Sequence, residues 1–228
     1  MFSANLNSCL SFINSQTAIT PKQKAVRRAV TISRMAGCGA VYVAEKVAQY
    51  LQKHAPTPDV QWTVFDRQLM NKVLEDHKLP KFLEFFLPED RASFIQDTLA
   101  DIFHTHPTAD QMVKLISETV VQLADMGNVV IVGRGANIVT AKMPNVLHVR
   151  LVADLEDRIE RVCREYNKTP EEARRYCEEA DPARTRYLKA YFKTDINDPL
   201  YYHIIINTSR MDYEQTAKLI GDALLRMP

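Results

Sequence analysis

The chain has 228 residues, of which 46% are hydrophobic and 25% charged, and its formal net charge is +1. This length and balance suit one globular domain with a smaller appendage. A near-neutral chain lacks the broad basic surface that binding through counterion release requires, so we expect no nucleic-acid partner.

Membrane and secretory segments are not expected either. No segment approaches the ~18 apolar residues that span a bilayer, and the first residues, MFSANLNSCLSFINSQ, lack the basic and apolar regions of a secretory signal. The four cysteines, Cys9, Cys38, Cys163 and Cys177, follow no metal-binding spacing and are expected to be free thiols. These features predict a cytoplasmic protein.

Residues 1–27 are predicted to form an N-terminal helix and a linker, ahead of a domain over 28–228. Within residues 4–16, apolar side chains fall on one side of a short helix. So short a helix is marginal alone, and we expect it to dock on the body or on a second subunit, as in a homodimer.

Five short apolar runs alternate with segments of helical periodicity. The runs are predicted to be strands at 29–32, 61–65, 128–132, 146–152 and 202–207. Helical structure is predicted over most of 68–126, in a charged region at 155–193, and over 212–226. This alternation predicts the α/β class, as a three-layer α/β/α sandwich with a mostly parallel sheet.

Glycine is concentrated at two places where ligands collect in such sheets. Four of the six glycines, Gly37, Gly39, Gly133 and Gly135, lie just after the first and third predicted strands. The loop and helix start after the first strand consist of Gly37, Cys38, Gly39, Ala40, Val41 and Tyr42. Backbone N–H groups at such a turn can bind an anion, and an ordinary tight turn is the alternative.

Several charged residues are further candidates for a phosphate or metal site. Arg134, between the second pair of glycines, could hold a phosphate or form a surface salt bridge. Asp66 ends the second strand, where it could order a magnesium shell or simply lie in a solvated turn. Asp181 is expected to open a helix carrying Arg184 and Arg186, which could close on a phosphate as part of a lid or pair with glutamates on a solvated face.

These segments, in this order, resemble the cytidylate kinase-like family of P-loop nucleoside monophosphate kinases. The resemblance covers most of 28–226 and depends on the segments VTISR followed by GCG, then FDRQL, NVVIVGRGA, PNVLH with EDRI, and YYH leading to IN. It implies the P-loop fold with a helical lid at about 155–193. It also implies transfer of the ATP γ-phosphoryl group to CMP or a similar acceptor, with Mg²⁺.

The resemblance assigns roles to particular residues. Gly37 to Gly39 would match the glycine loop, Asp66 the acidic residue of the acceptor site, and Arg134 the arginine that contacts the acceptor. Arg184 and Arg186 would match lid arginines.

The loop also departs from the pattern G-x-x-x-x-G-K-[ST]. Arg34 stands at the first glycine, Ala40 at the lysine, and Val41 and Tyr42 where the magnesium-binding hydroxyl belongs. Gly135 replaces the aspartate that follows the arginine in cytidylate kinases.

Three functions follow from this pattern. The first is a phosphotransferase in which Arg34 supplies the missing charge and Asp66 the missing magnesium ligand. The second is a nucleotide sensor or interaction protein without turnover, and the third is a scaffold without ligand.

Overall fold

The computed structural model describes residues 27–54, 61–66 and 109–228. The helix predicted within 4–16, and the part of the helical region 68–126 that precedes residue 109, lie outside these residues. None of the described helices is long and apolar enough to cross a membrane. Cys38, Cys163 and Cys177 are free thiols, as the sequence predicts.

The described strands form one five-stranded sheet in the order β2-β3-β1-β4-β5, and every pairing is parallel. The strands are β1 (Ala29–Arg34), β2 (Thr63–Phe65), β3 (Val129–Val132), β4 (Val146–Val152) and β5 (Ile204–Asn207). The α/β fold with a parallel sheet is therefore confirmed. The central position of β1 places the loop after it between the ends of its two neighbours.

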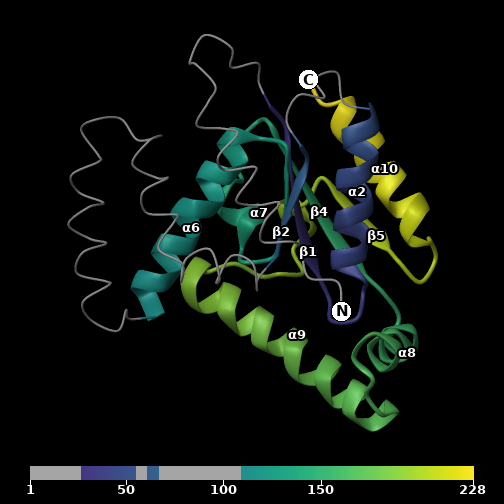
Figure 1. Ribbon diagram of the computed structural model, residues 1–228. Helices are drawn as coiled ribbons and strands as arrows, with labels where there is room; N and C mark the ends of the chain where they lie inside the picture. Colours follow the sequence, from purple (N-terminus) through teal and green to yellow (C-terminus); the bar gives the residue numbers. More distant parts are fainter. Residues whose placement is uncertain (1–26, 55–60, 67–108) are drawn as a thin grey trace.

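Helices cover both faces of the sheet (Figure 1). One face carries α2 (Ala40–His54) and α10 (Tyr213–Leu225), and the other carries α6 (Ala109–Met126) and the short α7 (Ala136–Val139). The main core lies on the α2 and α10 face, where alternate residues of the inner strands, such as Ile32, Val130 and Leu151, are buried. This face is apolar because α2 and α10 cover it and exclude water.

Beyond the carboxyl ends of the strands lies a hairpin of α8 (Leu155–Tyr166) and α9 (Pro170–Phe192). The sequence predicted a helix start at Asp181, but α9 begins at Pro170 and continues through Pro182. An interior proline removes one backbone hydrogen bond, so packing must offset its cost. The first half packs on α8 through Ala173 and Cys177, and Leu188 is buried in the second half.

The second face of the sheet buries polar side chains. His148 of β4 is 5% exposed, its Nδ1 lies 2.8 Å from Oγ1 of Thr31, and its ring stacks on His203 at 4.9 Å. Burial, and then the charge of His203, lowers the pKa of His148 from 6.5 to about 4. His148 is therefore neutral in the folded protein at neutral pH.

We expect this histidine to make the fold sensitive to acid. Between pH 6.5 and about pH 4, His148 is protonated in the unfolded chain and neutral in the folded chain. The free energy of unfolding therefore decreases as the pH is lowered through this range. The loss from this residue is up to about 3 kcal/mol. Denaturant unfolding between pH 7 and 4, on the native protein and on His148→Gln, measures it. An equally steep decline in the variant would contradict the assignment.

Candidate functional site

A small cavity lies where the carboxyl ends of β1 and β3 face α9. Its volume is about 40 Å³, and it is lined by Ser33, Arg34, Gly133, Arg134, Gly135, Asn137, Arg184, Tyr187, Leu188 and Ile196. Three of these residues are arginines from three separate elements, and no aspartate or glutamate is among them. We call it the three-arginine cavity.

Arg34 reaches the cavity by lying directly against Gly133. Gly133 has φ +86°, and a Cβ atom there would overlap Nη1 of Arg34. Gly133 is thus required twice, for its left-handed backbone and for the close approach of the guanidinium. The glycine after the third strand and the arginine after the first therefore form one local structure.

Arg134 occupies a strained backbone position. Its φ is +60°, between two glycines that also have positive φ. A left-handed conformation costs a residue with a Cβ about 1–2 kcal/mol, and such strain is concentrated at functional sites. Arg134, in this strained turn, lines the cavity.

The electrostatics of the cavity are unfavourable for its own cations. Burial, and then the positive charge of Arg184, lowers the pKa of Arg34 to about 10, well below the usual value of an arginine. Arg134 lowers it further, whereas Tyr176 and Asp66 act in the opposite direction. Partly buried charges of one sign that lie close together would be stabilised by a bound anion.

Arg184 and Arg186 do not share a location. Arg184 lines the cavity, whereas Arg186 is exposed and lines neither of the two cavities described for the protein. Two residues along a helix are separated by about 200°, so one of them faces the cavity and the other faces away. The structure therefore joins Arg34, Arg134 and Arg184, and leaves Arg186 outside.

Asp181 ties α9 to the phosphate loop, the segment 35–39 after β1. Its Oδ1 accepts hydrogen bonds from the backbone N–H of Ala36 at 2.7 Å and from Nη1 of Arg184 at 2.8 Å. Its Oδ2 accepts one from Nη1 of Arg158 at 2.6 Å. Arg158 is 6% exposed and also donates to the carbonyl oxygen of Ala36. One carboxylate thus connects the loop, α8 and α9.

The phosphate loop and the first turn of α2 lie beside this arrangement. Of the predicted residues, Gly37 to Tyr42 line neither cavity. Gly39 lies so close to Tyr213 of α10 that a Cβ would overlap the phenol ring. Burial raises the pKa of Cys38 to about 11, so its thiol stays protonated at neutral pH. Cys38 therefore fills space in the loop, consistent with its burial.

Asp66 ends β2 on the far side of β3. Its charge acts on both Arg34 and Glu45, although it does not line the three-arginine cavity. Glu45 lies in α2, and burial together with the negative charge of Asp66 raises its pKa. These two carboxylates are therefore close enough to repel each other.

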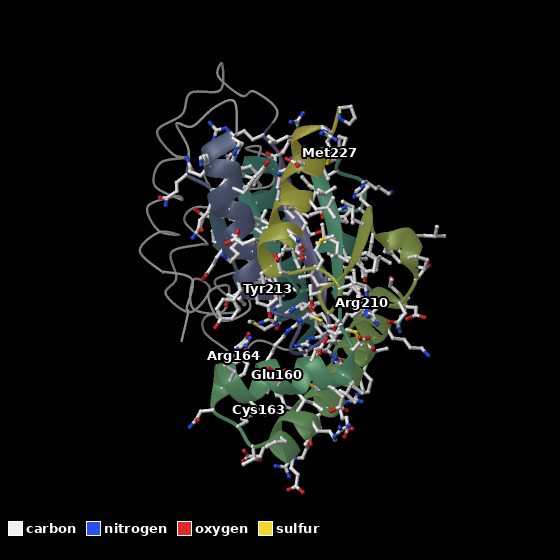
Figure 2. All side chains as sticks on the ribbon, turned by 90° about the vertical axis from the view of Figure 1, so that its right-hand side faces the viewer. Glu160, Cys163, Arg164, Arg210, Tyr213 and Met227 are labelled. Carbon is white, nitrogen blue, oxygen red and sulfur yellow. The ribbon has the colours of Figure 1, made fainter. Side chains whose placement is uncertain are left out.

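A second, larger cavity lies toward the β5 side of the sheet. Its volume is about 340 Å³, and it is lined by Asp157, Glu160, Arg161, Arg164, Thr208, Asp212 and Tyr213. Figure 2 shows Tyr213 at the start of α10 facing Glu160 and Arg164 of α8. Arg161 donates to Oγ1 and the carbonyl oxygen of Thr208, at 3.0 and 2.7 Å, and lies 5.4 Å over the Tyr213 ring.

Sequence reasoning missed part of this second cavity. It considered the arginines of α8 only as members of a charged region, and it did not single out Thr208 or Tyr213. A signal for Thr208 existed, since it directly follows β5 and ligands collect at the carboxyl ends of parallel strands. Tyr213 begins a helix, and nothing in the local sequence links it to Gly39.

Comparison with known proteins identifies the family to which this chain belongs. The sequence profile of the cytidylate kinase-like family matches residues 29–210, which is most of the chain. The chain belongs to the cytidylate kinase-like family. This membership supports a nucleotide kinase-like role, and it fits a parallel sheet with a glycine loop after its central strand.

Two members with the name cytidylate kinase are similar in sequence. One, from Pyrococcus horikoshii, is 29% identical over 206 residues, which cover 90% of each chain. The other, from Methanopyrus kandleri, is 31% identical over 111 residues, covering 45% of this chain and 58% of that protein. A crystal structure of an uncharacterized protein from Eubacterium ventriosum has the same fold, with a TM-score of 0.59 at 19% identity, over 87% of this chain and 98% of that one.

We expect Asp181→Asn to destabilise the protein and loosen α9. The variant leaves the buried Arg158 without its charged partner, and removing one member of a partly buried pair costs about 1–3 kcal/mol. Urea unfolding measures the loss. The matched control is Glu156→Gln, which breaks the exposed ion pair with Arg174 and should change stability little. Equal stability of the two variants would show that Asp181 does not hold the elements together.

Proposed function

We propose that this protein is a phosphotransferase that moves the γ-phosphoryl group of ATP to a nucleoside monophosphate such as CMP. The observation that carries the proposal is the three-arginine cavity, where Arg34, Arg134 and Arg184 meet without a lining carboxylate. Guanidinium groups hold phosphate oxygens in bidentate geometry, and a phosphate monoester would bring negative charge to the point where the three side chains meet.

The proposed chemistry is a direct transfer. An oxygen of the acceptor phosphate attacks the γ-phosphorus, and the bond to the bridging oxygen of the β-phosphate breaks, so that ADP leaves. The transition state spreads negative charge over three equatorial oxygens, and fixed cations around them lower its energy. Arg34 is the proposed substitute for the absent loop lysine, because it ends β1 at the base of the phosphate loop and lines the cavity.

The second cavity is the proposed site of the donor nucleotide. It adjoins the phosphate loop, since Tyr213 contacts Gly39 and Oγ1 of Thr208 lies 3.4 Å from the carbonyl oxygen of Cys38. Arg161 is fixed between Thr208 and Tyr213, so it needs no reordering to meet a ligand. With this assignment the donor and the acceptor approach the loop from its two sides.

Kinases of this family imply Mg²⁺ with ATP, and the chain offers ligands that suit it. Mg²⁺ is usually held by one or two carboxylates together with substrate phosphates. Asp66 and Glu45 fit that need, because their mutual repulsion, which contributes to the raised pKa of Glu45, would be relieved by a cation. The bound ion would neutralise charge on the phosphates. No group of three or more metal-binding side chains occurs among the described residues.

A second candidate function is nucleotide binding without turnover. Two observations favour it: Ala40 stands at the lysine position, and the Tyr213 ring packs onto Gly39 of the phosphate loop. The three-arginine cavity argues against the third function, a scaffold without ligand, because packing alone gives no reason to bring three cations together.

Turnover measurements with ATP, Mg²⁺ and a panel of nucleoside monophosphates separate the two candidates. For the phosphotransferase we expect measurable turnover with CMP and a loss of ~10²–10³ in kcat for Arg34→Ala. The control is Arg174→Ala, an exposed arginine on α9 outside both cavities, which should leave kcat unchanged.

The variant Ala40→Lys tests the missing lysine directly. A silent native protein that gains turnover in Ala40→Lys would support nucleotide binding without catalysis. Rapid native turnover that Arg34→Ala leaves intact would overturn the role given to Arg34.

A further inference from the structure

Asn137 is a buried polar residue in the three-arginine cavity that sequence analysis did not single out. It lies in α7, three residues after Arg134, and it is 4% exposed. Its side chain lines the cavity, and its Nδ2 has no hydrogen-bond partner among the described residues. A buried N–H₂ group without an acceptor is unusual, because each unpaired donor destabilises the folded state.

The neighbouring side chains explain why Nδ2 has no partner. The three arginines around the cavity are donors without acceptor atoms. The hydroxyl of Ser33, which could accept, is already bonded to Nη1 of Arg150 at 3.1 Å and to the hydroxyl of Tyr202 at 3.3 Å. The hydroxyl of Tyr187, which also lines the cavity, does not accept from Nδ2 either, so a ligand in the cavity would supply the acceptor.

The size of the cavity limits that ligand. Its volume of about 40 Å³ is roughly three times the ~10–15 Å³ that one water molecule needs. This space suits a group of a few oxygen atoms and is too small for a nucleobase. The donors around it require that those oxygens be acceptors.

We propose that Nδ2 of Asn137 is a fourth donor to the phosphate of the acceptor, beside Arg34, Arg134 and Arg184. The ligand class is a phosphate monoester, or inorganic phosphate as its smallest representative. The inference rests on the proposed function. It adds a neutral residue whose hydrogen bond would help to position the phosphate. A neutral donor adds no charge to a cluster whose cations already repel one another.

Two substitutions at this position should both weaken phosphate binding and should differ in their effect on stability. Asn137→Leu removes the donor and the unpaired group together, so we expect weaker phosphate binding, by about tenfold or more, with a melting temperature close to that of the native protein. Asn137→Asp places a carboxylate among the arginines, so we expect a higher melting temperature without ligand and phosphate binding weakened at least about 100-fold.

Calorimetric titration with inorganic phosphate and with CMP, together with thermal unfolding, tests these outcomes without any need for turnover. The matched control is Asn145→Leu, since Nδ2 of Asn145 already donates to the carbonyl oxygens of Arg27 and Ala124. That variant should lower the melting temperature and leave phosphate affinity unchanged.

Two results would overturn the inference, and they are distinguishable. If the native protein binds phosphate and both Asn137 variants bind it equally well, Asn137 is structural and the proposed function stands. If the native protein binds neither phosphate nor CMP, the cavity is not an anion site and both proposals fail. A lower melting temperature of Asn137→Asp would also contradict a position beside the arginines.

Discussion

The carboxylate of Asp181 is the interaction on which the site depends. It is shared by the backbone of the phosphate loop, Arg158 of α8 and Arg184 of α9, and the loop lies 145 residues before Asp181 in the sequence. Without it, Arg158 would be a buried cation with only a carbonyl oxygen as acceptor. The apolar contacts of Ala36 with α8 and α9 support the same junction. The hairpin of α8 and α9 is therefore held directly against the phosphate loop.

The three-arginine cavity combines several features that destabilise the folded state and that packing alone does not require. Arg134 holds a left-handed backbone, Arg34 lies with its guanidinium against Gly133, and the pKa of Arg34 is lowered by burial and by its neighbours. Asn137 adds an unpaired donor. Each feature destabilises the ligand-free protein, and each would be relieved by the same kind of ligand, a small group of negatively charged oxygens. This convergence on one ligand class is a stronger indication than any single residue.

The phosphate loop differs from the family pattern in ways that would affect how it handles a bound nucleotide. The loop lacks its lysine, yet a cation remains at its base in Arg34 and another faces it from α9 in Arg184. In the proposed phosphoryl transfer, the absence of the lysine would weaken the neutralisation of charge on the phosphates, whereas the backbone turn of the loop would be unaffected. Tyr213 adds a second feature, because its ring covers Gly39 at the edge of the larger cavity.

The sequence by itself determined the order of the elements, because the period of apolar residues and the glycines after two strands depend only on local structure. It also indicated Arg134 as a charged residue after a strand and Arg184 on a charged helix, and the comparison with the phosphate-loop pattern indicated Arg34. It could not place Arg186 outside the cavity, because the direction of a helical side chain depends on which face packs. It could not find Asn137, Asp181 or Tyr213 as site residues either. Asparagine, aspartate and tyrosine are ordinary in helices. Each of these three residues gains its role from the end of β1 or the loop after it, Asn137 beside Arg34, Asp181 from Ala36 and Tyr213 from Gly39. These neighbours lie more than a hundred residues earlier in the sequence, and only the tertiary structure brings them together.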